Sequence, residues 1–147
     1  MRYTLAHAAL IHYAQARPMD ATRLSEAQLR ARFNAGRSIS MDCSEGVTAL
    51  CKWAGLHDPN GNHFNGYGAT GSLLAHLPHY ADQRRAKVGA LCVFGPGSGD
   101  HVAMVLEPGS DPLMWSHGGE HGPVRVRWSA ERSYHRAPAT FLSIASL

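Results

Sequence analysis

One cysteine stands where its thiol could act as a nucleophile. Cys43 is the second residue of the segment 42–55, whose apolar spacing predicts a helix, so Cys43 would lie in the first helical turn. The unpaired amides and the dipole of a helix start stabilise a thiolate, which is the reactive form of cysteine. The same amides could hold the oxyanion that forms when sulfur attacks an amide carbonyl. The position of Cys43 therefore predicts a catalytic thiol.

Two histidines are predicted to lie at one end of a β-hairpin. The turn 107–112 joins two apolar runs, and counting outward from its centre puts His101 opposite residue 118. Opposed residues in such a pair have Cβ atoms about 4.5–5.5 Å apart. His117 is one register step away, so we expect the two imidazoles side by side. A base with an orienting group beside it is what a cysteine nucleophile requires.

Metal binding is the alternative use of these histidines. The chain has ten histidines, and His101, His117, Glu120 and His121 could together bind zinc. His117 and His121 have helical spacing, but the glycines and the proline around His121 disfavour a helix there. We therefore expect no metal and no cofactor.

The predicted elements place these residues in one α+β domain that spans residues 1–147. In the helix 42–55, Asp42 and Glu45 form a capping-box pattern and Gly55 stands at the C-terminal end. Further helices are predicted over 4–10, 20–33 and 72–77, a loop over 57–71, and strands over 88–94, 101–106, 113–117, 124–128 and 141–144. Helices followed by a meander predict N-terminal helices packed on an antiparallel sheet of about five strands.

The composition narrows the functional classes. Hydrophobic residues make up 44% of the chain and charged residues 17%, as in globular proteins. No apolar run approaches the roughly 20 residues of a membrane span, and the N-terminus does not read as a signal peptide. The net charge is +3, but no dense basic run occurs, so we expect no nucleic-acid partner. Cys51 and Cys92 are expected in the core, since three cysteines without a CxxC pair argue against a disulfide framework.

Four blocks of the sequence, in this order, resemble the NlpC/P60 cysteine peptidases. The blocks are Asp42–Val47, Lys87–Phe94, Gly99–Leu106 and Trp115–His117. The resemblance extends over about residues 3–128, with strong matches only in these blocks. It implies a papain-like α+β fold and cleavage of an amide bond in the peptide stems of bacterial cell walls.

The resemblance also implies roles for individual residues. Cys43 would be the nucleophile, His101 the general base, and His117 the group that orients His101. Asp42 and Ser44, which flank the nucleophile, would contact the free end of the stem peptide.

Two further positions bear on this resemblance. Tyr13 could match the substrate-side tyrosine of the family, although the segment between Tyr13 and Cys43 is longer than usual. Glu45 departs from the family pattern, which has a glycine there. A carboxylate facing Cys43 would raise the pKa of the thiol. We expect Glu45 to serve in the helix cap instead.

A narrower likeness is to wall hydrolases from phages of actinobacteria, carried by residues 11–13, 54–61 and 66–71. It implies an endolysin or a tail-associated lysin, made in the host cytoplasm and delivered by a holin or by the virion. Its partners would be peptidoglycan stem peptides and other phage tail or lysin components. Two alternatives stay open: a virion structural or wall-binding module with little turnover, and a zinc-dependent amidase.

Overall fold

The structure, a computed structural model of the chain, describes residues 12–13, 24–25, 27–28, 31, 35, 40–117 and 124–147. The predicted helix 4–10 and most of the predicted helix 20–33 lie outside these residues. The elements are β1 (His12–Tyr13), β2 (Ser40–Met41), α3 (Cys43–Trp53), α4 (Thr70–His76), β3 (His79–Tyr80), η1 (Gln83–Arg85), β4 (Leu91–Phe94), β5 (His101–Glu107), β6 (Leu113–Ser116), β7 (Val124–Arg127), α5 (Trp128–Tyr134) and β8 (Ala139–Leu142).

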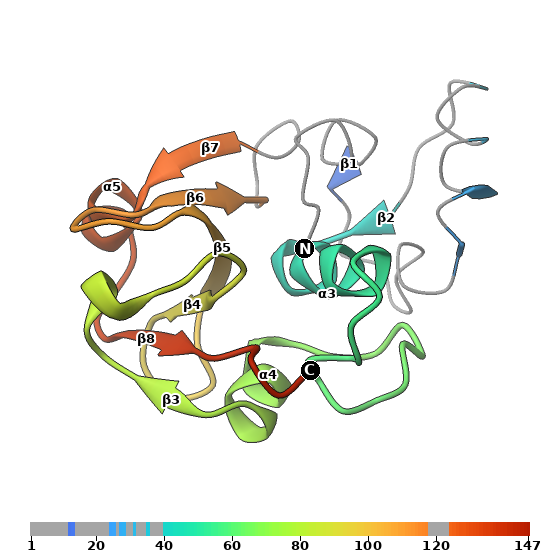
Figure 1. Cartoon of the computed structure of the whole chain (residues 1–147), viewed down its shortest axis with the longest axis horizontal. Helices are drawn as coiled ribbons and strands as arrows, with labels where there is room; N and C mark the ends of the chain where they lie inside the picture. The colour runs from blue at the N-terminus through green and yellow to red at the C-terminus, as the bar shows by residue number, and fades with distance from the viewer. Residues whose placement is uncertain are drawn as a thin grey trace.

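The larger sheet is antiparallel and has the strand order β3-β8-β4-β5-β6-β7 (Figure 1). This confirms the predicted α+β class and the meander from β4 to β7. The sheet has six strands rather than about five, because β3 adds to its edge by pairing His79 with Leu142. Two residues are too few to show an alternating pattern, so pairing with β8, and not local sequence, defines this strand.

The hairpin of β5 and β6 has the register that was predicted from the turn. Ala103 pairs with Ser116, and Met104 pairs with Trp115. Because opposed residues point to the same face of a sheet, this register also decides which face each side chain reaches.

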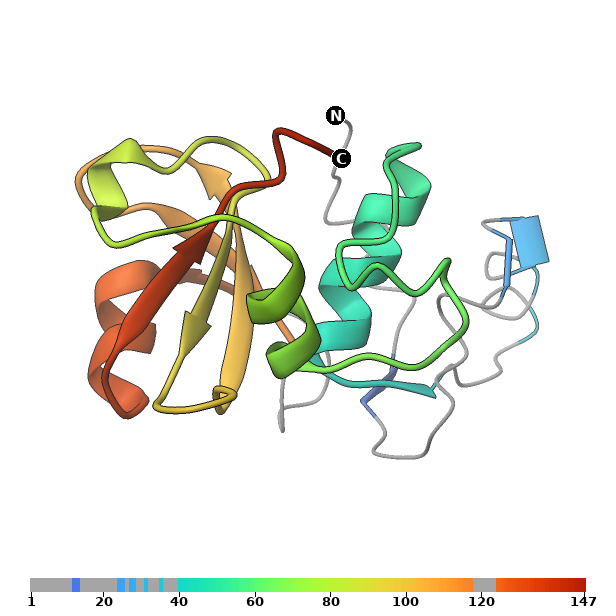
Figure 2. The ribbon, with the colours of Figure 1, turned by 90° about the horizontal axis from the view of Figure 1, so that it is seen from below.

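The sheet separates two groups of helices, which Figures 1 and 2 show on opposite sides of it. On the α3 side, Val47 and Leu50 pack with Val102, Met104 and Trp115. Burying side chains of this size stabilises the fold by roughly 1.5–3 kcal/mol each. The residues packed on the α5 side include Cys92, Phe94, Ala103, Val105, Met114, Trp128 and Phe141.

The helix α3 begins at the N-cap that its sequence predicts. Asp42 is its N-cap, and the Asp42 carboxylate accepts a hydrogen bond from the Glu45 N–H at 2.9 Å. Gly55, with φ +77°, follows the last turn in a left-handed conformation that glycine adopts without strain. An N-cap such as Asp42 stabilises a helix by about 1 kcal/mol.

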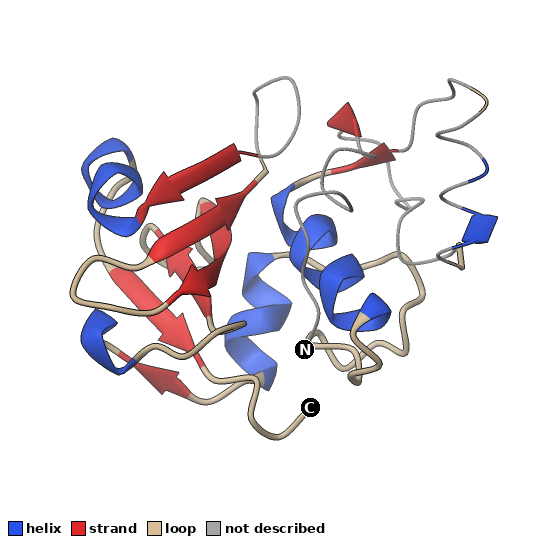
Figure 3. Cartoon of the chain, turned by 45° about the horizontal axis from the view of Figure 1, so that its top comes forward, coloured by secondary structure: helices blue, strands red, loops and turns tan. Residues whose placement is uncertain are grey.

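The helix α5 is not among the predicted elements. The predicted strand 124–128 ends at Arg127, and Trp128 begins α5, which lies against the sheet in Figure 3. Ala130, Glu131 and Arg132 favour a helix, but seven residues are too few to display a helical apolar period. None of the helices in the described ranges has both the length and the apolar character needed to cross a membrane.

Candidate active site

Cys43 is the first residue of α3, and its side chain is partly exposed. The backbone N–H of Val102, in β5, donates to the Cys43 thiol, as do the N–H groups of Ser44 and of Cys43 itself. The thiol therefore lies where the start of a helix meets the beginning of a central strand. Backbone donors that converge on one sulfur are suited to hold a thiolate, or an oxyanion formed beside it.

The ionisation of Cys43 reflects two opposing influences. Burial raises the pKa of the thiol to about 11, and this outweighs the lowering by the backbone N–H of Val102. The Asp42 carboxylate also contributes to this raised pKa. The resting group is therefore a neutral thiol at pH 7.

Asp42 and Ser44, the two predicted substrate-binding residues beside Cys43, are hydrogen-bonded to each other. The Ser44 hydroxyl donates to Asp42 Oδ1 at 2.9 Å. Ser44 is only 3% exposed, whereas Asp42 is partly exposed. Asp42 is thus the more accessible of the two to a ligand.

Tyr13 lies in β1, which pairs with the strand that leads into the nucleophile Cys43. In the two-stranded parallel sheet of β1 and β2, Tyr13 pairs with Met41, two residues before Cys43. The side chain of Tyr13 lies outside what the structure describes.

His101 begins β5 and is buried on the α5 side of the sheet. Its Nε2 lies 2.8 Å from Ser116 Oγ, in a hydrogen bond whose donor depends on the imidazole tautomer. Its ring stacks on that of His135, with centroids 4.6 Å apart. Burial, together with the charges of His135 and His117, lowers the pKa of His101 to about 4.

His117 lies on the other side of the sheet from His101. It is fully buried, and its ring stacks on that of Trp115, which packs against α3. The register explains this, because it continues from the pairing of Ala103 with Ser116 to put His117 opposite Val102, and one step from Val102 to His101 turns a side chain to the other face. The two histidines are therefore at the same end of the hairpin, as predicted, but their side chains diverge.

The structure brings Cys43 next to the backbone of β5 rather than to the imidazole of His101. Val102, whose N–H reaches the thiol, directly follows His101 in the chain. Among the residues that the structure describes, no hydrogen bond joins Cys43 to His101. The His101 side chain would have to turn in order to contact the thiol, or His117 would have to act on the thiol from the α3 side.

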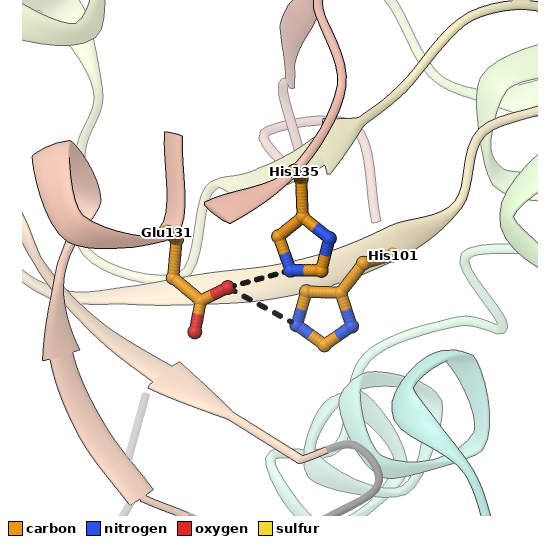
Figure 4. Close-up of side chains that lie close together, drawn as sticks. All are labelled: His101, Glu131 and His135. Atoms are coloured by element: carbon orange, nitrogen blue, oxygen red, sulfur yellow. Dashed lines mark hydrogen bonds and ion pairs between the residues drawn. The ribbon is translucent and has the colours of Figure 1, made fainter. Parts of the chain in front are cut away.

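A cluster around His101 was not foreseen from the sequence. Glu131 of α5 and His135, which directly follows α5, lie beside His101, and Figure 4 shows nitrogens of both imidazoles facing one carboxylate oxygen. Glu131 Oε2 accepts from His135 Nε2 at 2.8 Å and lies 3.8 Å from His101 Nε2. The i, i+4 spacing of Glu131 and His135 would have indicated that they act together, had the helix α5 been predicted.

Other candidates are separate from this region. Cys51 and Cys92 are fully buried, as predicted for core residues. Glu120 and His121, considered above as zinc ligands, lie outside the described residues. A pocket of about 520 Å³, lined in part by Tyr80, Arg85 and Ile144, includes none of the predicted site residues.

No family model, curated protein or solved structure matches this chain.

Proposed function

We propose that this chain is a cysteine hydrolase that cleaves an amide bond in the stem peptides of bacterial peptidoglycan. The observation that carries the proposal is the Cys43 thiol at the start of α3, with N–H groups of Val102 and Ser44 directed at its sulfur. The likeness of four sequence blocks to the NlpC/P60 peptidases, with their papain-like fold, supplies the substrate class.

The reaction starts from a neutral thiol and a neutral imidazole. The pKa of Cys43 is raised to about 11 and that of His101 is lowered to about 4, so the proton leaves the thiol during attack rather than before it. Sulfur bonds to the carbonyl carbon, and the backbone N–H groups hold the oxyanion.

His101 then transfers protons in the remaining steps of the reaction. His101 Nε2 lies 2.8 Å from Ser116 Oγ, so the side chain must leave this contact and turn toward Cys43 before the imidazole accepts the thiol proton. The imidazolium protonates the leaving amine as the C–N bond breaks. Water attacks the thioester, His101 takes up its proton, and the thiol re-forms with release of the peptide acid. The resemblance assigns His117 to orient His101 after this turn to the α3 side, and Asp42, Ser44 and Tyr13 to bind the stem.

A phage source accounts best for the narrower likeness of the sequence. The protein would act as an endolysin or as a tail-associated lysin, made in a host cytoplasm and delivered by a holin or by the virion. Other tail or lysin components are its expected protein partners.

The test compares two cysteines of the same helix. Cys43→Ala should abolish the release of new amino termini from purified peptidoglycan, whereas Cys51→Ala should retain it. Circular dichroism checks that both variants are folded. Full activity of Cys43→Ala would refute the proposal, and mass spectrometry of the fragments identifies the bond that is cut.

A second candidate is a virion structural or wall-binding module that keeps the fold but has little turnover. One observation favours it: burial raises the pKa of the Cys43 thiol to about 11. Co-sedimentation of the chain with intact wall, without release of fragments by either cysteine variant or by the unaltered chain, would support this candidate.

A further inference from the structure

The side chains of His101, Glu131 and His135 converge on a small volume on the α5 side of the sheet (Figure 4). From this convergence we propose that they bind one divalent transition-metal ion, for which zinc is the best match. Two imidazoles and one carboxylate form a ligand set typical of zinc sites that keep a fourth position for water.

The distances from Glu131 to the two imidazoles bracket the separation that zinc requires. The three ligand atoms all lie within 4.8 Å of one another, and Glu131 Oε2 lies 2.8 Å from His135 Nε2 and 3.8 Å from His101 Nε2. Tetrahedral zinc with bonds of about 2.0–2.1 Å separates its ligand atoms by roughly 3.3 Å. The imidazole planes are 13° from parallel, so metal entry needs a tilt of one ring to make both lone pairs converge.

The environment suits a cation that enters from solvent. The side chains of His101, Glu131 and His135 are 8%, 12% and 17% exposed, so the site is sheltered but not sealed. The single carboxylate supplies negative charge, and the hydroxyl of Ser116, which lies 2.8 Å from His101 Nε2, gives up that hydrogen bond when the nitrogen coordinates the metal.

Residues next to two of the ligands hold the site in place. Asp100 precedes His101, and Arg136 follows His135, and their side chains form two hydrogen bonds of 2.8 and 2.9 Å. The His135 N–H also donates to the backbone oxygen of Glu131. Supporting interactions of this kind reduce the reorganisation that metal binding requires.

Metal at this site would switch off the proposed hydrolase, an extension that rests on the proposed function. An imidazole that coordinates through Nε2 carries its proton on Nδ1. His101 could then no longer accept the proton of the Cys43 thiol. Metal binding itself does not depend on that mechanism.

The test measures zinc binding to the full chain by equilibrium dialysis, with Cys43→Ala as the background so that the nucleophilic thiol is absent. We expect one zinc ion per chain. His135→Ala and Glu131→Gln should each weaken binding by about tenfold or more. His57→Ala, which removes an exposed histidine, is the matched control and should leave the affinity unchanged.

Two results would overturn the metal site: no zinc binding up to millimolar concentration, or equal affinity in His135→Ala and the background. Cobalt gives an independent readout, since nitrogen and oxygen ligands produce d–d bands without the charge-transfer band of a thiolate ligand.

In the chain that retains Cys43, zinc should inhibit hydrolysis, and His135→Ala should relieve this inhibition. Binding without inhibition would refute only the switch, and loss of hydrolysis in Cys43→Ala reports on the proposed function alone.

Discussion

The backbone N–H of Val102 donates to the thiol of Cys43. This contact joins the first turn of α3 to β5 at the residue that follows His101, two segments that are far apart in the sequence. It gives the sulfur a hydrogen-bond donor that the helix alone does not provide. Several measurable properties of the thiol depend on this arrangement.

The reactivity of Cys43 should rise steeply with pH. Because its pKa is about 11, only on the order of 10⁻⁴ of the thiol is ionised at pH 7. We expect slow alkylation by iodoacetamide at pH 7 and a rate that increases up to about pH 11, followed by mass spectrometry of the labelled peptides. Cys51 and Cys92, which are fully buried, should react only after unfolding. A rate for Cys43 that levels off below pH 8 would contradict this assignment.

Two substitutions of Asp42 should distinguish the effect of its charge on the Cys43 thiol from its role as the N-cap of α3. Asp42→Asn keeps a good N-cap but removes the carboxylate that raises the pKa of Cys43. We expect faster alkylation at pH 8 with nearly unchanged stability. Asp42→Ala should also lose about 1 kcal/mol in the free energy of unfolding, measured in urea. Equal alkylation rates in Asp42→Asn and the unaltered chain would exclude an electrostatic role for the carboxylate.

The two histidines should differ in their effect on turnover. If His101 is the general base, His101→Ala should lower kcat on isolated wall peptides by about 10²–10⁴-fold. His117→Ala should have a smaller effect, since His117 is assigned to orient the base. The reverse order would transfer the role of base to His117, whose ring lies on the same side of the sheet as α3.

The loop before α4 should depend on Asp58. The buried Asp58 carboxylate accepts hydrogen bonds from the N–H groups of Asn60, Asn62 and Phe64 at 2.8–3.1 Å. Asp58→Ala leaves these donors unpaired and should reduce the free energy of unfolding by about 1–3 kcal/mol. Glu107→Ala, at an exposed site in contact with Arg125, is the control and should change stability little. Equal stabilities of the two variants would show that the Asp58 contacts contribute nothing.

Stability should fall in alkaline solution because of the buried thiols. Burial raises the pKa of Cys92 from 9.0 to about 12, so the unfolded chain releases this proton first as the pH rises. Its contribution to stability is therefore complete below pH 9 and decreases between pH 9 and about 12. Urea denaturation from pH 8 to 10.5 should show a shallower decline for Cys92→Ala. Parallel declines would mean that other groups cause the loss.

The sequence by itself predicted the α+β class, the helix that begins at Cys43, and the register of the β5–β6 hairpin. These features depend on local signals: the apolar spacing of α3, the cap at Asp42, and a turn whose centre sets which residues oppose one another. The burial of Cys51 and Cys92 followed from the same patterns.

Only the tertiary structure decided what surrounds each reactive group. The predicted register already turns His101 and His117 to opposite faces, but only the fold shows which face meets α3, and the position of α5 brings Glu131 and His135 to His101. The pKa of Cys43 likewise depends on how deeply α3 packs against β5, because desolvation is set by neighbours from distant parts of the chain. Packing between remote segments leaves no periodic trace in the sequence of either one.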